Sequence, residues 1–228
     1  MKFVFRLLKT ILALLVTIAW LLQGCASSDE FSSVLTNPSV LPCWFEICPN
    51  STVSADALDH LAAHKSIKEG SIIVREVDSH SSFIDWDFMP PISDIGRVYL
   101  YDNRVSLLRI WTRDKVLVSD VIDKYGFPSA IFAYSDCADS RWLYVAVIYE
   151  SRGIYLVHFD DNWQSDENPE IDPNTIVTEV LYYSPGQLKD LMLQVEGGNW
   201  PQLTSDDIQS NVQTWTGFGE IEVLKVCG

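Results

Sequence analysis

Two short stretches of the chain have the apolar spacing of an amphipathic helix. They are Ser54–Leu61 (SADALDHL) and Val118–Tyr125 (VSDVIDKY), and each places apolar residues three or four positions apart on one helical face. The two stretches align with Ser54 opposite Val118. Both read Asp, two apolar residues, Asp, a Lys or His, then a large apolar residue. The pattern predicts two helices of similar type in different parts of the chain.

Strand-like stretches follow each predicted helix. In residues 83–88 (FIDWDF), apolar and acidic residues alternate, as is typical of a strand with one buried face. Asp102-Asn103 has the chemistry of a two-residue hairpin turn, and Ser151-Arg152-Gly153 separates another pair of apolar runs. The stretches with strand character are residues 71–77, 83–88, 97–111, 129–135, 141–150, 153–159 and 175–183.

This order of elements predicts the fold class. A helix followed by antiparallel strands, twice, indicates an α+β fold in which short helices pack on antiparallel sheets, in two tandem related units. Because the aligned stretch is short, chance similarity of two amphipathic helices is the alternative. The expected organisation is a signal peptide at 1–24, a lipid-anchored flexible tether at 25–42, a first unit at 43–111, a second unit at 112–160, and an acidic loop with a strand-helix-strand extension at 161–228.

Two stretches also resemble known proteins. Residues 116–135 (VLVSDVIDKYGFPSAIFAYS) contain a helix pattern, the motif Gly126-Phe127-Pro128 and a strand pattern. They resemble the β-lactamase-inhibitor-protein-like fold, which includes the small lipoprotein of the outer-membrane barrel assembly machinery. That resemblance implies α+β units that bind other proteins without catalysis. Residues 41–58 are similar to the start of uncharacterised anchored bacterial proteins that begin Pro-Cys-Trp, a likeness that implies no function.

The N-terminal segment up to Cys25 has the pattern of a bacterial export signal. Residues 1–9 carry three basic and no acidic side chains, and residues 10–22 carry no charge. Because a membrane-spanning helix needs about 20 apolar residues, an uncleaved anchor is the second interpretation. Leu22-Gln23-Gly24-Cys25 resembles the lipobox, which implies acylation of Cys25, removal of residues 1–24 and attachment to the membrane through the lipid. Ala26 after the cysteine implies that a two-membrane bacterium would not retain the protein at its inner membrane.

Charge excludes one class of partner. The formal net charge is −15 and becomes −18 when the three cations of the signal are removed. So acidic a chain repels nucleic acid and anionic lipid head groups. Nucleic acid is therefore not an expected partner.

Four cysteines remain once Cys25 is lipidated. An even number in an exported protein favours two disulfides, and four cysteines allow three pairings. The sequence does not choose among the pairings, and free thiols are the alternative. The four are Cys43, Cys48, Cys137 and Cys227.

Metal chemistry has two weak candidates. Cys43, Cys48, His60 and His64 approach the Cys₂His₂ zinc spacing, although oxidised cysteines and exposed histidines are the favoured interpretation. The acidic segment 160–174 supplies Asp160, Asn162 and Asp166 as oxygen ligands but lacks the glycine and closing glutamate of a calcium loop, so a solvated loop is expected. No motif for a nucleophile, a phosphate loop or a zinc hydrolase occurs, so no catalytic residue and no cofactor is assigned.

These observations predict a membrane-anchored extracytoplasmic lipoprotein of the cell membrane or outer membrane, facing the periplasm or the exterior. We expect it to be a non-enzymatic module that binds another protein. The alternative is a secreted hydrolase or carbohydrate-binding protein that uses a carboxylate site. A cavity that contains paired acids and aromatic side chains would favour that alternative.

Overall fold

The computed structural model describes residues 34–90, 95–136, 142–163, 168–188, 206 and 210–226. The predicted signal peptide, Cys25 and residues 26–33 of the predicted tether lie outside these residues. Within the described ranges, no helix has both the length and the hydropathy needed to cross a membrane.

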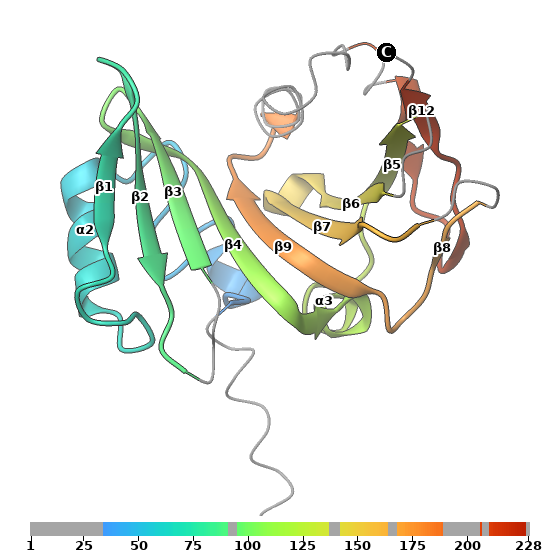
Figure 1. The fold of residues 1–228 in the computed structure, drawn as a ribbon, viewed down its shortest axis with the longest axis horizontal. Helices are drawn as coiled ribbons and strands as arrows, with labels where there is room; N and C mark the ends of the chain where they lie inside the picture. The colour runs from blue at the N-terminus through green and yellow to red at the C-terminus, as the bar shows by residue number, and fades with distance from the viewer. Residues whose placement is uncertain are drawn as a thin grey trace, which may run out of the picture. The chain divides into compact units, whose positions relative to one another are not determined.

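The main feature of the described chain is one ten-stranded sheet (Figure 1). The strand order is β1-β2-β3-β4-β9-β7-β6-β5-β10, with β12 also beside β5; that last pair is parallel and every other pair is antiparallel. A separate two-stranded sheet pairs β8 with β11. The strands are β1 (Ile73–Glu76), β2 (Ser81–Asp87), β3 (Ile95–Tyr101), β4 (Arg104–Leu117), β5 (Ala130–Asp136), β6 (Leu143–Tyr149), β7 (Ile154–Asp160), β8 (Glu170–Ile171), β9 (Ile176–Tyr183), β10 (Gln213–Thr214), β11 (Gly219–Glu220) and β12 (Leu224–Val226).

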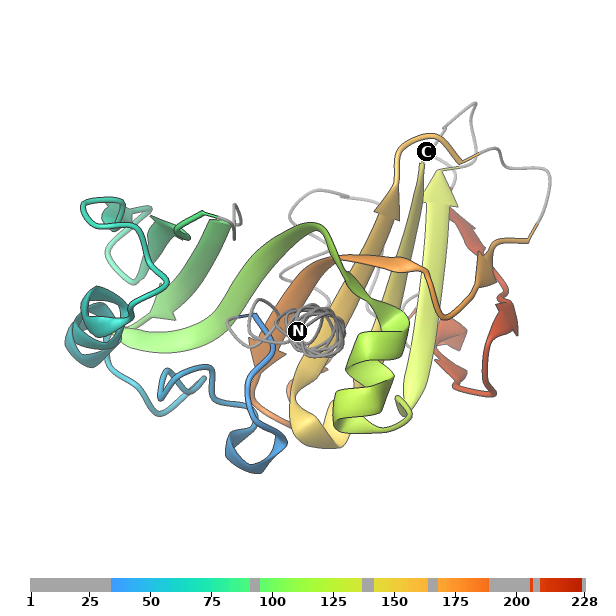
Figure 2. The same ribbon diagram turned by 90° about the horizontal axis from the view of Figure 1, so that it is seen from below.

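The two predicted helices are confirmed. They are α2 (Ser54–Ala63) and α3 (Val118–Tyr125), and the described residues also form two short 3₁₀ helices, η2 (Pro38–Val40) and η3 (Glu150–Arg152). Figure 2 shows α3 directly after the end of β4. The predicted helix after Ser184 lies largely outside the described residues.

The predicted α+β class is wrong, because the described chain is mostly antiparallel β-sheet. The physical reason lies in β4, which is 14 residues long and runs across the expected unit boundary between residues 111 and 112. β4 pairs with β9, and this contact joins the strands of both ranges into one sheet. Two helices of ten and eight residues cannot cover a sheet of that size.

Local turn chemistry sets the register of the hairpins. Asp102 and Asn103, between β3 and β4, have φ values of 46° and 63°, as a tight primed turn requires at both central positions. Gly153 has a φ of 65° between β6 and β7, and a Cβ there would lie 2.1 Å from the carbonyl oxygen of Tyr183. Both hairpins predicted from the sequence are confirmed.

The side chains of β2 separate the two faces of this part of the sheet. Trp86 is buried and stacks on Trp44 of the segment before α2, at 5.5 Å between ring centroids. Because successive side chains of a strand alternate, Phe83 and Asp85 lie on the opposite face, which also carries Arg97. We call it the arginine face; across β1 to β4 and β9 it carries Arg75, Phe83, Asp85, Arg97, Tyr99, Arg109, Trp111 and Glu179.

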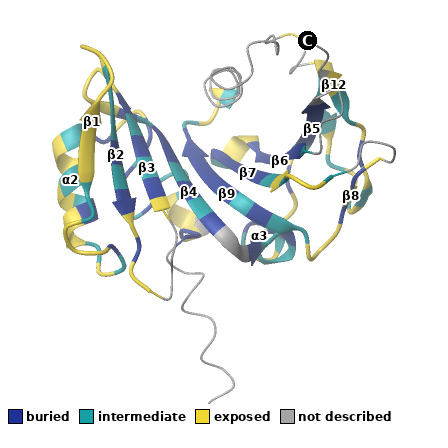
Figure 3. Ribbon diagram, in the orientation of Figure 1, coloured by how far each residue is buried: buried dark blue, intermediate teal, exposed yellow. Residues whose placement is uncertain are grey.

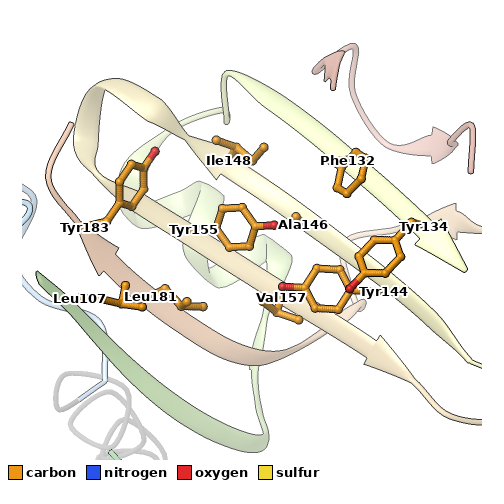
Figure 4. Close-up of a cluster of buried hydrophobic side chains, with 10 residues drawn as sticks. All are labelled: Leu107, Phe132, Tyr134, Tyr144, Ala146, Ile148, Tyr155, Val157, Leu181 and Tyr183. Atoms are coloured by element: carbon orange, nitrogen blue, oxygen red, sulfur yellow. The ribbon is translucent and has the colours of Figure 1, made fainter. Parts of the chain in front are cut away.

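A buried aromatic cluster occupies the same side of the sheet farther along. Figure 4 shows its tyrosine, phenylalanine and aliphatic side chains on β4, β5, β6, β7 and β9. Leu188, Val212 and Leu224 of the C-terminal part pack against it. Figure 3 shows the result, with β6 and β7 largely buried and β1 exposed.

The segment before η2 is packed against the fold. Val34, Leu35 and Thr36 are buried. The hydroxyl of Tyr125 donates to the Thr36 carbonyl, and that of Tyr182 donates to the Val34 carbonyl, both at 2.8 Å. Residues 34–42, which the sequence assigns to the tether, thus contain part of the folded structure.

Candidate functional site

The described residues contain one disulfide, at one of the pairings that the sequence leaves open. Cys43 and Cys48 are joined, with 4.1 Å between their Cα atoms. The bridge closes a short loop in which Trp44 and Ile47 pair through their backbones. Cys137 and Cys227 lie outside the described residues.

This disulfide leaves no thiolate for the zinc interpretation. His60 lies with its Nδ1 3.3 Å from a carboxylate oxygen of Glu46. His64 stacks on Trp44 with 5.4 Å between ring centroids, and burial, with a smaller effect of the Lys65 charge, holds the pKa of His64 below its ordinary value. Among the residues that the structure describes, no group of three His, Cys, Asp or Glu side chains is placed to bind a metal ion.

The acidic segment after β7 begins with a local turn. Asn162 donates its backbone N–H to a carboxylate oxygen of Asp160 at 2.9 Å, and its side-chain amide donates to Asp161 at 2.6 Å. Asp166 lies outside the described residues.

The arginine face contains a cluster of two cations and one carboxylate. Arg97 donates from Nε and Nη2 to the two oxygens of Asp85, at 2.6 and 3.2 Å. Arg75 approaches the same carboxylate with its Nε at 3.8 Å. The hydrogen bonds to Asp85 raise the pKa of Arg97 above its ordinary value. Asp85 is thus held by Arg97, and the charge of Arg75 is only partly compensated.

Aromatic rings alternate with these guanidinium groups. The Cζ atom of Arg97 lies 4.2 Å from the ring centroid of Phe83, and that of Arg109 lies 4.7 Å from the centroid of Trp111. Contacts of this kind contribute about 0.5–2 kcal/mol each, depending on burial. They fix long side chains that would otherwise be mobile.

A second ion pair crosses from β4 to β9. Arg109 donates from Nε and Nη2 to both oxygens of Glu179, each at 2.7 Å. Both side chains are mostly buried, with 15% and 12% of their surfaces exposed. Burial alone would lower the pKa of Arg109. The charge of Glu179 and the hydrogen bonds to it have a larger, opposite effect, so the pKa of Arg109 lies above its ordinary value.

A cavity of about 800 Å³ lies along the arginine face, with lining residues on strands from β1 to β9. Arg75, Asp85, Arg97 and Trp111 contribute to its wall. At its rim, the Nζ of Lys68 lies 3.9 Å from a carboxylate oxygen of Asp87, and both side chains are more than half exposed. The three lysine and arginine side chains of the wall balance its three carboxylates, although the whole chain is strongly acidic.

Hydrogen bonding fixes the carboxylate of this site. The two oxygens of Asp85 both accept hydrogen bonds from Arg97, so the guanidinium holds the carboxylate in one orientation. The arrangement places fixed cations beside aromatic rings on one face of the sheet.

This site is not among those predicted from the sequence. The signal for this site in the sequence was the alternation of polar or aromatic residues with buried aliphatic ones. Arg97 and Tyr99 flank buried Val98, and Arg109 lies between buried Leu108 and Ile110. Two arginines at alternate positions of a predicted strand indicate a polar face, but only the pairing of β2, β3, β4 and β9 brings their partners opposite them.

Comparison with known proteins finds no family model, curated protein or solved structure that matches this chain.

Proposed function

We propose that this protein is a lipid-anchored extracytoplasmic binding protein that recognises another protein of the cell envelope through its arginine face. The observation that supports the proposal most is the alternation of Arg97 and Arg109 with Phe83 and Trp111. Arginine and tryptophan are enriched among residues that dominate protein–protein binding energy. Because ion pairs already fix the two arginine side chains, binding a partner costs less conformational entropy for ordering them.

The proposed localisation rests on three features of the N-terminal sequence. They are the basic residues 1–9, the uncharged residues 10–22 and the lipobox-like sequence ending at Cys25. Acylation with two or more chains suffices for stable attachment to a membrane. Cys25→Ser removes the acylated sulfur. We expect the variant to remain unprocessed or to leave the membrane fraction after fractionation, with the intact mass measured for each species.

The binding proposal is tested by affinity capture from detergent-solubilised membranes, followed by mass spectrometry. Trp111→Ala and Arg97→Ala should both lose a protein that the unaltered chain retains. Phe127→Ala is the matched control, because Phe127 is 73% exposed and lies outside the arginine face. Circular dichroism checks that each variant is folded. Retention of the same protein by the Trp111 and Arg97 variants would contradict the proposal.

One observation favours the alternative of a carbohydrate ligand. The cavity of about 800 Å³ contains Trp111 together with Asp85 and Asp87 in its wall. Against it, guanidinium groups already lie over the rings of Phe83 and Trp111, where a sugar would stack. Binding of glycans on an array, lost in Trp111→Ala and retained in Phe127→Ala, would favour the carbohydrate ligand instead of a protein.

A further inference from the structure

The two edges of the main sheet differ. At one edge, the chain covers β5 with its own C-terminal strands β10 and β12. At the other edge lies β1, which pairs with β2, and within the described part of the chain no strand lies beyond it. All four residues of β1 are exposed, and Ile73 and Val74 expose about half of their surfaces, at 48% and 49%. An exposed apolar edge strand is a ready template for another strand.

The outward backbone groups of β1 follow from its pairing with β2. The N–H of Val77 donates to the carbonyl of Ser81 at 2.9 Å, so Val77 directs its backbone groups toward β2. Hydrogen-bonded and non-hydrogen-bonded residue pairs alternate along an antiparallel strand. The backbone N–H and C=O groups of Arg75 and Ile73 therefore also point toward β2. The N–H and C=O groups of Val74 and Glu76 therefore point away from the sheet.

The cavity continues to this edge. Ile73 and Arg75 of β1 line the cavity together with Trp111 and Thr178. Side chains on one face of an added strand would project over the cavity, since alternate residues of a strand share a face. Backbone pairing and side-chain recognition would then act on the same segment.

Charge identifies the side chain that this edge would accept. Asp85 is shared by Arg97 at 2.6 Å and Arg75 at 3.8 Å, so one carboxylate faces two cations. Arg75 is the more exposed cation, with 59% of its side chain accessible, against 30% for Arg97. A carboxylate directly opposite Arg75 on an added strand would pair with this exposed guanidinium, because opposite charges in cross-strand pairs are stabilising.

We propose that β1 binds an extended segment of a partner polypeptide by strand addition, with an acidic side chain opposite Arg75 and an apolar side chain two residues away, opposite Ile73. This inference rests on the proposed function and names the kind of segment that the arginine face recognises. A second copy of this chain is the less favoured occupant. Two chains of net charge −15 repel each other, and pairing of two four-residue strands buries far less than the roughly 800 Å² per partner of a stable interface.

The experiment begins with a displayed library of random nine-residue peptides selected on the immobilised full chain. We expect the enriched peptides to contain an acidic residue with an apolar residue two positions away. Each is then titrated in solution against Val74→Pro and Val74→Ala. Proline removes the outward N–H of Val74 without removing a hydrogen bond to β2, and alanine keeps that N–H. We expect at least a tenfold loss of affinity for Val74→Pro, about 1.4 kcal/mol or more, and less than a threefold change for Val74→Ala.

Charge reversal gives the second readout. Arg75→Glu should weaken the acidic peptides and strengthen versions in which their acidic residue is replaced by lysine. The proposal is overturned if no peptide is enriched, if Val74→Pro and Val74→Ala bind equally, or if a dimer seen by sedimentation of the unaltered chain disappears in Val74→Pro, since a second copy would then occupy the edge. If membrane capture fails in Trp111→Ala but persists in Val74→Pro, strand addition is wrong and the proposed function stands.

Discussion

The buried pair between Arg109 and Glu179 allows a quantitative test of the arginine face. Glu179→Leu removes the carboxylate and leaves a guanidinium that is mostly buried, since only 15% of the Arg109 side chain is exposed. Unit charges about 4 Å apart interact by about 4 kcal/mol at an effective dielectric constant of about 20. Removing one partner of a buried pair costs about 3–5 kcal/mol, because the other charge remains desolvated. We therefore expect the free energy of unfolding to fall by about 3–5 kcal/mol.

The double variant Arg109→Met with Glu179→Leu separates this cause from a loss of packing. Apolar residues of similar volume should restore most of the stability, because neither charge then remains buried. Urea unfolding followed by circular dichroism measures both values, with Lys68→Met as the control. Its partner Asp87 is 53% exposed, so we expect a loss of less than about 1 kcal/mol. A loss below about 1 kcal/mol for Glu179→Leu would refute the reasoning. So would a double variant whose loss of unfolding free energy equals the losses of Glu179→Leu and Arg109→Met added together.

Three further changes test other parts of the fold. Gly96→Ala would place a Cβ 1.9 Å from a ring carbon of buried Trp86, so we expect overpacking to cost at least about 1–3 kcal/mol; an unchanged melting temperature would contradict this close approach. The hydrogen bond and charge of Asp102 raise the pKa of His80, so Asp102→Asn should lower that pKa in an NMR titration. Since the folded value is the higher one, this pair stabilises the fold at pH below the ordinary value of 6.5, and the contribution disappears as pH rises through the raised value. Tyr182→Phe removes the donor to the buried Val34 carbonyl and should lower the free energy of unfolding by about 1–3 kcal/mol. Limited proteolysis should then cleave the chain more readily around Val34. An unchanged cleavage pattern would count against the packing of this segment on the fold.

Local patterns predicted the elements that depend on neighbouring residues. The helices at Ser54–Ala63 and Val118–Tyr125 follow from apolar spacing within a few turns. The hairpin turn at Asp102 and Asn103 follows from the tolerance of these residue types for positive φ. Such signals are contained in a window of a few residues.

The fold class was predicted wrongly because it depends on distant contacts. Trp111 pairs with Glu179, although α3 and four strands lie between them in the sequence. No periodicity in either strand specifies this partner, since many strands of the chain have similar apolar runs. The pairing decides that the strands of the described residues form one sheet instead of two helix-covered units.

The amino-acid sequence by itself determined the two helices, the hairpin turns and the strong negative charge, because each depends on residue type and short-range order. Tertiary structure alone decided that Arg75, Asp85, Arg97, Arg109 and Glu179 share one face, and that β1 remains at the edge while β10 and β12 cover the opposite one. The physical reason is that strand order and register are fixed by hydrogen bonds and side-chain packing between segments far apart in the chain.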